Sequence, residues 1–206
     1  MPGPETSADI AFLAADDPRL QPGAEVDEAR AAVLAADVDV DAERHRRTIL
    51  EFLDAHDDAL HRSCRTGHLT GSALVVDDAG ERVVVLLHRK LGLWLQPGGH
   101  CDGDANLAGV ALREALEETG IPDLRVHPVA VDLDVHRVDP PDDGPHLHLD
   151  ARYLVVAPPG AHPAGNHEST DIRWATPDEL ADLGVDDGTL RMARHGLARH
   201  RELTGR

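Results

Sequence analysis

Three glutamates that stand close together in the chain are the side chains best suited to do chemistry. Glu114, Glu117 and Glu118 lie in the run REALEETGI at residues 113–121. A helix turns by about 100° per residue, so the three carboxylates converge on one face within an arc of about 100°. Like charges at these spacings repel, and acids near a helix C-terminus oppose the macrodipole. The cluster therefore calls for a compensating cation, and hard divalent ions such as Mg²⁺ or Mn²⁺ prefer these oxygen ligands.

A Pro-Gly-Gly segment precedes this helix. Gly98 and Gly99 follow Pro97, and glycine lets a backbone approach a ligand closely and offer it carbonyl or amide groups. Such a loop beside three carboxylates predicts a site for a metal ion and a phosphate group. The alternative is an ordinary solvated helix face, on which Arg113 would pair with Glu117 at the i,i+4 spacing.

The same residues resemble the signature box of the Nudix hydrolases, G-x5-E-x7-R-E-U-x-E-E-x-G-U, where U is aliphatic. Gly99 and the run from Arg113 to Ile121 stand at the spacing of that box. Trp94 to Gly99 is similar to the family's lead-in, and Glu168 through Leu180 is similar to its ES-x-x-x-x-W segment. The resemblance covers about residues 67–185.

The box departs from the family pattern at two positions. Ala105 stands where the first box glutamate belongs, and Ala115 is smaller than the usual aliphatic residue. In the family the later glutamates supply most of the metal ligation, so Ala105 affects the detail of the site more than the metal itself. Asp104 or Asp102 is the candidate to replace the missing carboxylate through a water molecule.

The resemblance implies hydrolysis of a diphosphate bond in a nucleoside diphosphate linked to another group, or in a related organic diphosphate. The implied ligands of Mg²⁺ or Mn²⁺ are Glu114, Glu117 and Glu118, with the Gly98 carbonyl completing the set. Arg113 would orient a box glutamate by ion pairing. The metal would neutralise the diphosphate and activate a water.

The general base is not defined by the resemblance, because it can come from the box or from a later loop. We favour Glu114 as a ligand that also serves as base. Glu168, in the loop after residue 165, is the competing candidate, since a base must reach the attacking water.

Two other functional classes stay open. A nucleotide-binding regulatory module would keep the fold without turnover, and Ala105 is the residue that favours it. A transition-metal-binding protein would use some of the 14 histidines. Glu114, Glu117 and Glu118 favour the hydrolase over the module.

A second set of polar residues alternates along two expected strands. Asp132, Asp134 and His136 share one face of the first strand, and the polar residues of the second are His146, His148, Asp150 and Arg152. If these strands pair, their polar faces adjoin. This surface would bind a second metal such as Zn²⁺ or Mn²⁺, bind the nucleotide, or form a solvated sheet face with cross-strand ion pairs.

The elements that must position these residues are short β-rich runs around the box helix. Leu69–Val76 and Arg82–His88 flank a turn and predict a hairpin. The box helix is expected from about Ala105 to Thr119 and is closed by Gly120. Further strands are expected at 124–138, 146–157 and 171–174, and helices from 177 and at 188–203.

These elements, taken with the resemblance, predict an α/β fold: a Nudix α/β/α sandwich with a mixed sheet, in a domain of residues 67–206. Residues 1–66 are expected to form a flexible N-terminus, through residue 23, followed by a helical extension. Its second helix is expected to be capped by Asp39 or Asp41. The extension would pack on the domain, shape a substrate entrance, or form a homodimer interface.

Composition limits the partners. The 206 residues include 20 basic and 38 acidic side chains, a net charge of -18, which argues against binding a nucleic-acid polymer and favours a small-molecule partner. No apolar run approaches the roughly 18 residues that cross a bilayer, so no membrane partner is expected. Two cysteines are too few for a disulfide framework, which fits a cytoplasmic location.

Overall fold

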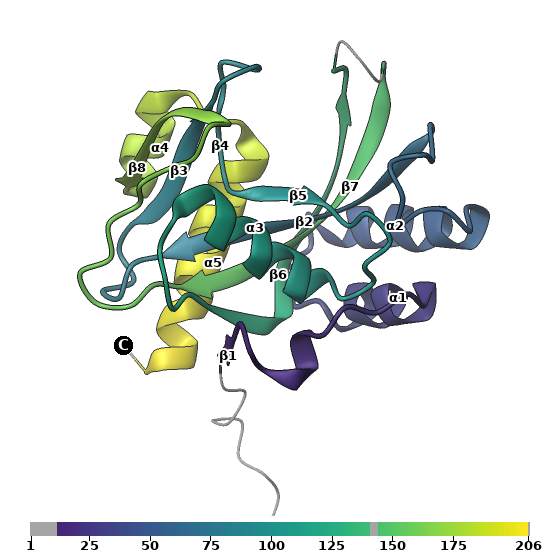
Figure 1. The fold of residues 1–206 in the computed structure, drawn as a ribbon, viewed down its shortest axis with the longest axis horizontal. Coiled ribbons are helices and arrows are strands. Elements are labelled where there is room, and N and C mark those ends of the chain that lie inside the picture. Colours follow the sequence, from purple (N-terminus) through teal and green to yellow (C-terminus); the bar gives the residue numbers. More distant parts are fainter. Residues whose placement is uncertain (1–11, 141–143, 206) are drawn as a thin grey trace, which may run out of the picture.

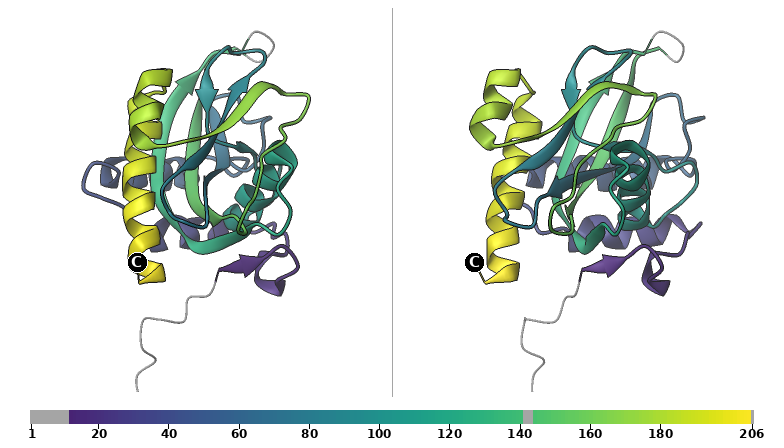
Figure 2. Two further views of the ribbon diagram at one scale, coloured as in Figure 1. Left: turned by 90° about the vertical axis from the view of Figure 1, so that its left-hand side faces the viewer. Right: turned by 60° about the vertical axis from the view of Figure 1, so that its left-hand side comes forward.

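A mixed β-sheet lies between helices in the computed structural model, which describes residues 12–140 and 144–205 (Figure 1). The strands are β1 (Leu13–Ala14), β2 (Gly67–Val76), β3 (Val83–His88), β4 (Trp94–Leu95), β5 (Gly98–His100), β6 (Arg125–Val138), β7 (His146–Val156) and β8 (Ser169–Ala175). The helices are the short 3-10 helix η1 (Pro18–Leu20), α1 (Val26–Ala35), α2 (Glu43–Ala55), α3 (Leu107–Thr119), α4 (Pro177–Leu183) and α5 (Asp187–Thr204). Figure 2 shows α5 and α3 on opposite sides of the sheet. The predicted α/β/α sandwich is therefore confirmed.

The sheet is mixed because β2 runs parallel to β7 along its whole length, whereas β6 and β7 are antiparallel. The strand order is β1-β6-β7-β2-β3-β4, with β5 paired to β2 and β8 paired to β3. β2 therefore lies between β7 on one side and β5 on the other. This position places residues from three distant parts of the chain next to one another.

The predicted hairpin exists only at its turn. β2 and β3 pair at the single position Val76↔Val83, and the Asp77 carboxylate accepts hydrogen bonds from the backbone N–H groups of Glu81 and Arg82. Beyond the turn β3 pairs with β8 and β4 instead. The strands separate because β2 makes its main-chain hydrogen bonds to β5 and β7.

The two faces of β2 meet different helices, since side chains alternate along a strand. A Cβ at Gly71 would lie 2.9 Å from Val110 of α3, so the face with Leu69, Gly71 and Ala73 is covered by the box helix. On the other face Leu74 packs in the apolar cluster that contains Met192 of α5. His68, Thr70 and Ser72 share this second face with Leu74.

The box helix begins two residues later than expected, at Leu107. Asn106 is its N-cap, and the side chain accepts a hydrogen bond from the Gly109 N–H at 3.0 Å. The helix ends at Gly120, which has φ 63°, a left-handed conformation that glycine adopts without strain. These two caps set the positions at which the three glutamates leave the helix.

The N-terminal residues divide into three parts. Residues 1–11 of the segment expected to be flexible lie outside the described residues, whereas residues 12–23 hold β1, which pairs with β6, and η1. The helical extension contains α1 and α2, and both contact β6. The expected cap of α2 by Asp39 or Asp41 is wrong, because the N-cap is Ala42 without a side-chain cap; Asp39 accepts a hydrogen bond from the Ala42 N–H, one turn earlier, at 2.9 Å. The boundary at residue 67 stays a prediction.

None of the helices in residues 12–140 and 144–205 has both the length and the apolar character needed to cross a membrane.

Candidate functional site

Two glutamates of α3, Glu114 and Glu118, lie against strand β5 at close range. The Gly98 N–H donates a hydrogen bond to Glu118 Oε2 at 2.9 Å. A Cβ at Gly99 would lie 2.5 Å from the carboxylate carbon of Glu114, so a larger residue would displace this side chain. The glycines therefore let β5 approach the carboxylates, as the sequence predicts for a ligand site.

The electrostatics of this carboxylate cluster (Glu114, Glu117 and Glu118) favour a bound cation. Burial raises the pKa of Glu118 to about 7, and the charges of Glu114, Glu168 and Glu117 act in the same direction against the Gly98 hydrogen bond. Burial also raises the pKa of Glu114, opposed by Arg113 and assisted by Glu117 and Glu168. Mutually repelling oxygen donors, of which Glu118 is buried and Glu114 partly buried, fit a hard divalent ion, which would stabilise their charged forms.

Arg113 pairs with neighbours other than Glu117. Its guanidinium lies 3.3 Å from Asp104 Oδ2 and 3.6 Å from Glu114 Oε1. The predicted alternative of an i,i+4 pair with Glu117 is not among the ion pairs found in the described residues, whereas contact with a box glutamate is present. Arg113 therefore lies where it can orient Glu114.

The two aspartates considered as replacements for the first box glutamate hold other parts of the chain. Asp104 accepts hydrogen bonds from the backbone N–H groups of Gly23 and Asn106, at 3.1 and 2.9 Å. Asp102 pairs with Arg62, with its oxygens 2.7 and 2.5 Å from the guanidinium. Both carboxylates thus have structural partners, and their role toward a metal stays a prediction.

Ala105 lies at a position that the N-terminal segment covers. The residue has no exposed surface, and its N–H donates to the Gly23 carbonyl at 2.7 Å. The neighbouring Asn106 side chain donates to the carbonyls of Arg19 and Gln21. Sequence analysis missed this packing, because no local pattern indicates which distant segment will cover a box position.

Glu168 is brought to the carboxylate cluster by the loop between β7 and β8. Asn166 of this loop donates a side-chain hydrogen bond to the Glu117 carbonyl at 3.3 Å, and Arg89 donates its N–H to the Glu168 carbonyl at 2.8 Å. The Glu168 side chain is half exposed, and its charge raises the pKa values of Glu114 and Glu118. Both candidate bases therefore lie at one site.

The polar faces of β6 and β7 adjoin as predicted. Asp132 pairs with Arg152 in the register, and Asp134 with Asp150. Arg152 is 2% exposed at its side chain and makes ion pairs to Asp132, Asp134 and Asp150 at 3.1, 3.1 and 2.8 Å. The predicted cross-strand ion pairs exist, but they are buried. Removing one partner of a buried network is costly because a charge stays unpaired.

Residues far away in the sequence complete this buried network. Arg191 of α5 lies 3.1 Å from Asp132 and 3.2 Å from Asp134. The hydroxyls of Thr70 and Ser72 donate to Asp150 Oδ1, at 2.9 and 2.8 Å. Sequence analysis missed these three residues, although the period of two along residues 68–72 marks Thr70 and Ser72 as one face.

A histidine cluster borders the network at one end of the same face. It consists of residues whose neighbouring ring centroids lie 4.8 to 5.6 Å apart: His68, His100, His136, His146 and His148. The register brings them together, since His68 pairs with His148 and His148 with His136. The sequence indicated the three histidines of β6 and β7. His68 was missed.

Comparison with known proteins gives one family and a fold. The family model described as "NUDIX domain" matches residues 67–195. A hydrolase of the NUDIX family from Clostridium perfringens has 21% sequence identity and a TM-score of 0.52, covering 65% of this chain and 97% of that one. An Ap4A hydrolase from C. elegans has 16% identity and a TM-score of 0.51, with 64% and 98% covered. At these identities the solved structures show a shared fold.

Proposed function

We propose, from the premise that the chain belongs to the Nudix domain family, that it is a Mg²⁺- or Mn²⁺-dependent diphosphohydrolase. Its substrate would be a small molecule, either a nucleoside diphosphate linked to another group or a related organic diphosphate. The observation that carries the proposal is the carboxylate cluster held against Gly98 and Gly99. Family membership supports hydrolysis of a diphosphate, and this cluster supports the dependence on a metal.

The residues that would hold the metal are Glu114, Glu117 and Glu118, with the Gly98 carbonyl. When bound, the divalent cation would neutralise the diphosphate and make a water more acidic. Burial and repulsion, which raise the pKa values of Glu114 and Glu118, make these carboxylates poor sites for unbalanced charge. A bound cation would balance the negative charge of these glutamates and that of an anionic substrate, in a chain whose net charge is -18.

Glu114 would take the proton from the attacking water. A base must reach the water that it deprotonates, and Glu114 belongs to the carboxylate cluster that would hold the metal and its water. Arg113, 3.6 Å from Glu114 Oε1, would hold the carboxylate in its orientation. Glu168, more exposed and on a loop, is the second candidate for the base.

The test is an assay of purified protein on a panel of nucleoside diphosphate sugars, dinucleotides, triphosphates and non-nucleotide diphosphates. Each reaction contains Mg²⁺, Mn²⁺ or EDTA, and products are identified by mass. We expect cleavage of one class that EDTA abolishes. Cleavage that resists the chelator contradicts the metal dependence, and tight binding of a nucleotide without any product supports the regulatory module instead.

A further inference from the structure

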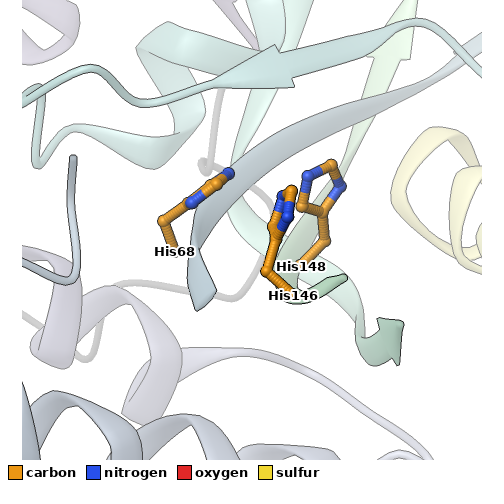
Figure 3. A group of neighbouring side chains, drawn as sticks. All are labelled: His68, His146 and His148. Carbon is orange, nitrogen blue, oxygen red and sulfur yellow. The ribbon is translucent and has the colours of Figure 1, made fainter. Parts of the chain in front are cut away.

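Three rings of the histidine cluster converge from two strands. His68 on β2 and His146 and His148 on β7 each offer a ring nitrogen, and these nitrogens lie within 4.8 Å of one another (Figure 3). His68 is 3% exposed and His146 is 7% exposed, whereas His148 is partly exposed. Two of the three rings are therefore buried, and solvent reaches the group at His148.

Buried ring nitrogens of two members of this group, His68 and His146, lack the partners that buried polar atoms require. Neither ring nitrogen of His68 makes a hydrogen bond of normal geometry, although the Cys64 backbone lies close to the ring, and Nε2 of His146 has no hydrogen-bond partner. Buried polar groups without partners are rare in folded proteins and call for a ligand, an ion or a water. Three imidazoles lie together here, two of them with buried nitrogens that lack a good partner, and this arrangement points to an ion as the missing partner.

His146 is already oriented in the way that metal-binding histidines are. Its Nδ1 lies 2.8 Å from the Gly144 carbonyl, which accepts a hydrogen bond only if Nδ1 carries the proton. The lone pair is then on Nε2, the nitrogen that is buried and unpartnered. A backbone carbonyl that holds the second ring nitrogen is the usual support of a histidine ligand.

We propose that His68, His146 and His148 bind a Zn²⁺ ion. A tetrahedral zinc with bonds of about 2.0 to 2.1 Å separates its nitrogens by about 3.3 Å. Small side-chain rotations that move each ring nitrogen by about 1 Å would bring the three nitrogens to this separation. Imidazole nitrogens are preferred ligands of zinc rather than of Mg²⁺. Three protein ligands with a fourth position for water are a common zinc arrangement.

This zinc site is separate from the carboxylate cluster. Gly99 of β5 faces Glu114, whereas a Cβ at Gly98 would meet Ser72. Since side chains alternate and Ser72 shares its face with His68, the zinc ligands lie on the opposite face of the strand pair from the glutamates. The proposal therefore does not rest on the diphosphohydrolase activity, and one can fail without the other.

The experiment measures zinc binding in protein made without a histidine tag. Zinc content is determined after equilibration with Zn²⁺ and removal of the excess, and Kd by competition with a chromogenic chelator. We expect one zinc per chain. His68→Gln and His148→Gln each remove one of three ligands and should raise Kd by at least about 100-fold, the upper end of the loss seen for supporting residues.

Two matched controls locate the ion. His162→Gln changes an exposed histidine and should keep the zinc. Cys64→Ser removes one member of a second group that could hold a metal, His56, Asp58 and Cys64, and should also keep it. Loss of zinc in Cys64→Ser, or retention of zinc in His148→Gln, overturns the proposal. Wild-type protein that takes up no stoichiometric zinc also overturns it, and the unpartnered nitrogens would then be satisfied by water.

Folding is checked by circular dichroism, because His68 is buried and its substitution alters the interior. His148 is partly exposed, so His148→Gln carries the test if His68→Gln does not fold. Folded His148→Gln protein with a wild-type zinc Kd overturns the proposal.

Discussion

The carboxylate cluster and the histidine cluster lie on opposite faces of the strand pair β2 and β5, and the chain assembles them in different ways. Three carboxylates leave one helix within five residues of sequence, Glu114 to Glu118. The five histidines come from β2, β5, β6 and β7. A site on one helix follows from helical periodicity, whereas a site across four strands exists only after the strands have paired in register.

The two clusters also differ in what they lack. Burial raises the pKa of Glu118 to about 7, and neighbouring glutamates add to this shift, so the carboxylates lack positive charge. Burial lowers the pKa of His68 to about 4, assisted by the charge of His100 and opposed by the nearby Cys64 backbone. A neutral ring has no charge to balance but retains a lone pair. The first cluster suits a hard ion, and the second suits zinc.

Glu114→Gln should produce the largest effect and tests the carboxylate side of the comparison. Loss of the base should lower kcat/KM by about 1000-fold, within the range for general bases. The assay uses the substrate class found in the panel, and Glu51→Gln, an exposed glutamate on α2, is the matched control. Activity within threefold of wild type would remove Glu114 from the mechanism.

Ala105→Glu restores the first glutamate of the box and tests whether its carboxylate can join the carboxylate cluster. Ala105 is fully buried under the N-terminal segment, so an added carboxylate should destabilise the fold by about 3 kcal/mol. Urea unfolding measures the change, and Ala31→Glu on the exposed face of α1 should change it by less than about 0.5 kcal/mol. Unchanged stability together with higher activity would mean that the new glutamate reaches the site.

Glu117→Gln separates metal binding from folding. Glu117 is exposed on α3, so its loss should leave the free energy of unfolding within about 0.5 kcal/mol of wild type. Activity at limiting Mg²⁺ should fall by about 100-fold and recover partly at high Mg²⁺, as expected for a weakened ligand set. An unchanged dependence of the rate on Mg²⁺ counts against Glu117 as a ligand.

Zinc should stabilise the protein through the histidine cluster alone. At about ten times its Kd, Zn²⁺ adds about 1.4 kcal/mol, which raises Tm by about 3 to 6 °C for a chain of this size. Each variant is compared with its own metal-free form in a thermal scan. Glu117→Gln should keep the shift and His68→Gln should lose it. The opposite pattern would place the zinc on the carboxylates and abolish the distinction between the clusters.

Glu168→Gln should have the smallest effect if Glu114 is the base. Glu168 is half exposed, so its charge should be worth about 1 kcal/mol, or about 5-fold in kcat/KM. Steady-state kinetics at saturating metal measure this value. A loss larger than that of Glu114→Gln would transfer the role of base to Glu168.

Local patterns predicted much of the fold. The box helix was expected from residue 105 and begins at Leu107, because the Asn106 side chain caps it whereas Asp104 also bonds the N-terminal segment at Gly23. β6 and β7 lie within one residue of their expected bounds, since the period of two is long and regular there. The hairpin of β2 and β3 extended no further than Val76↔Val83, because competing partners for β2 come from distant residues.

The sequence by itself determined the carboxylate cluster, because Glu114, Glu117 and Glu118 converge on one face of any helix. Gly99 can lie against them because it has no side chain. Tertiary structure alone decided that residues 19–23 cover Ala105 and that Arg191 enters the buried network of Arg152. It also decided that His68 meets His146 and His148. These contacts join residues many tens of positions apart, and their formation depends on strand register and helix packing, which the global fold determines.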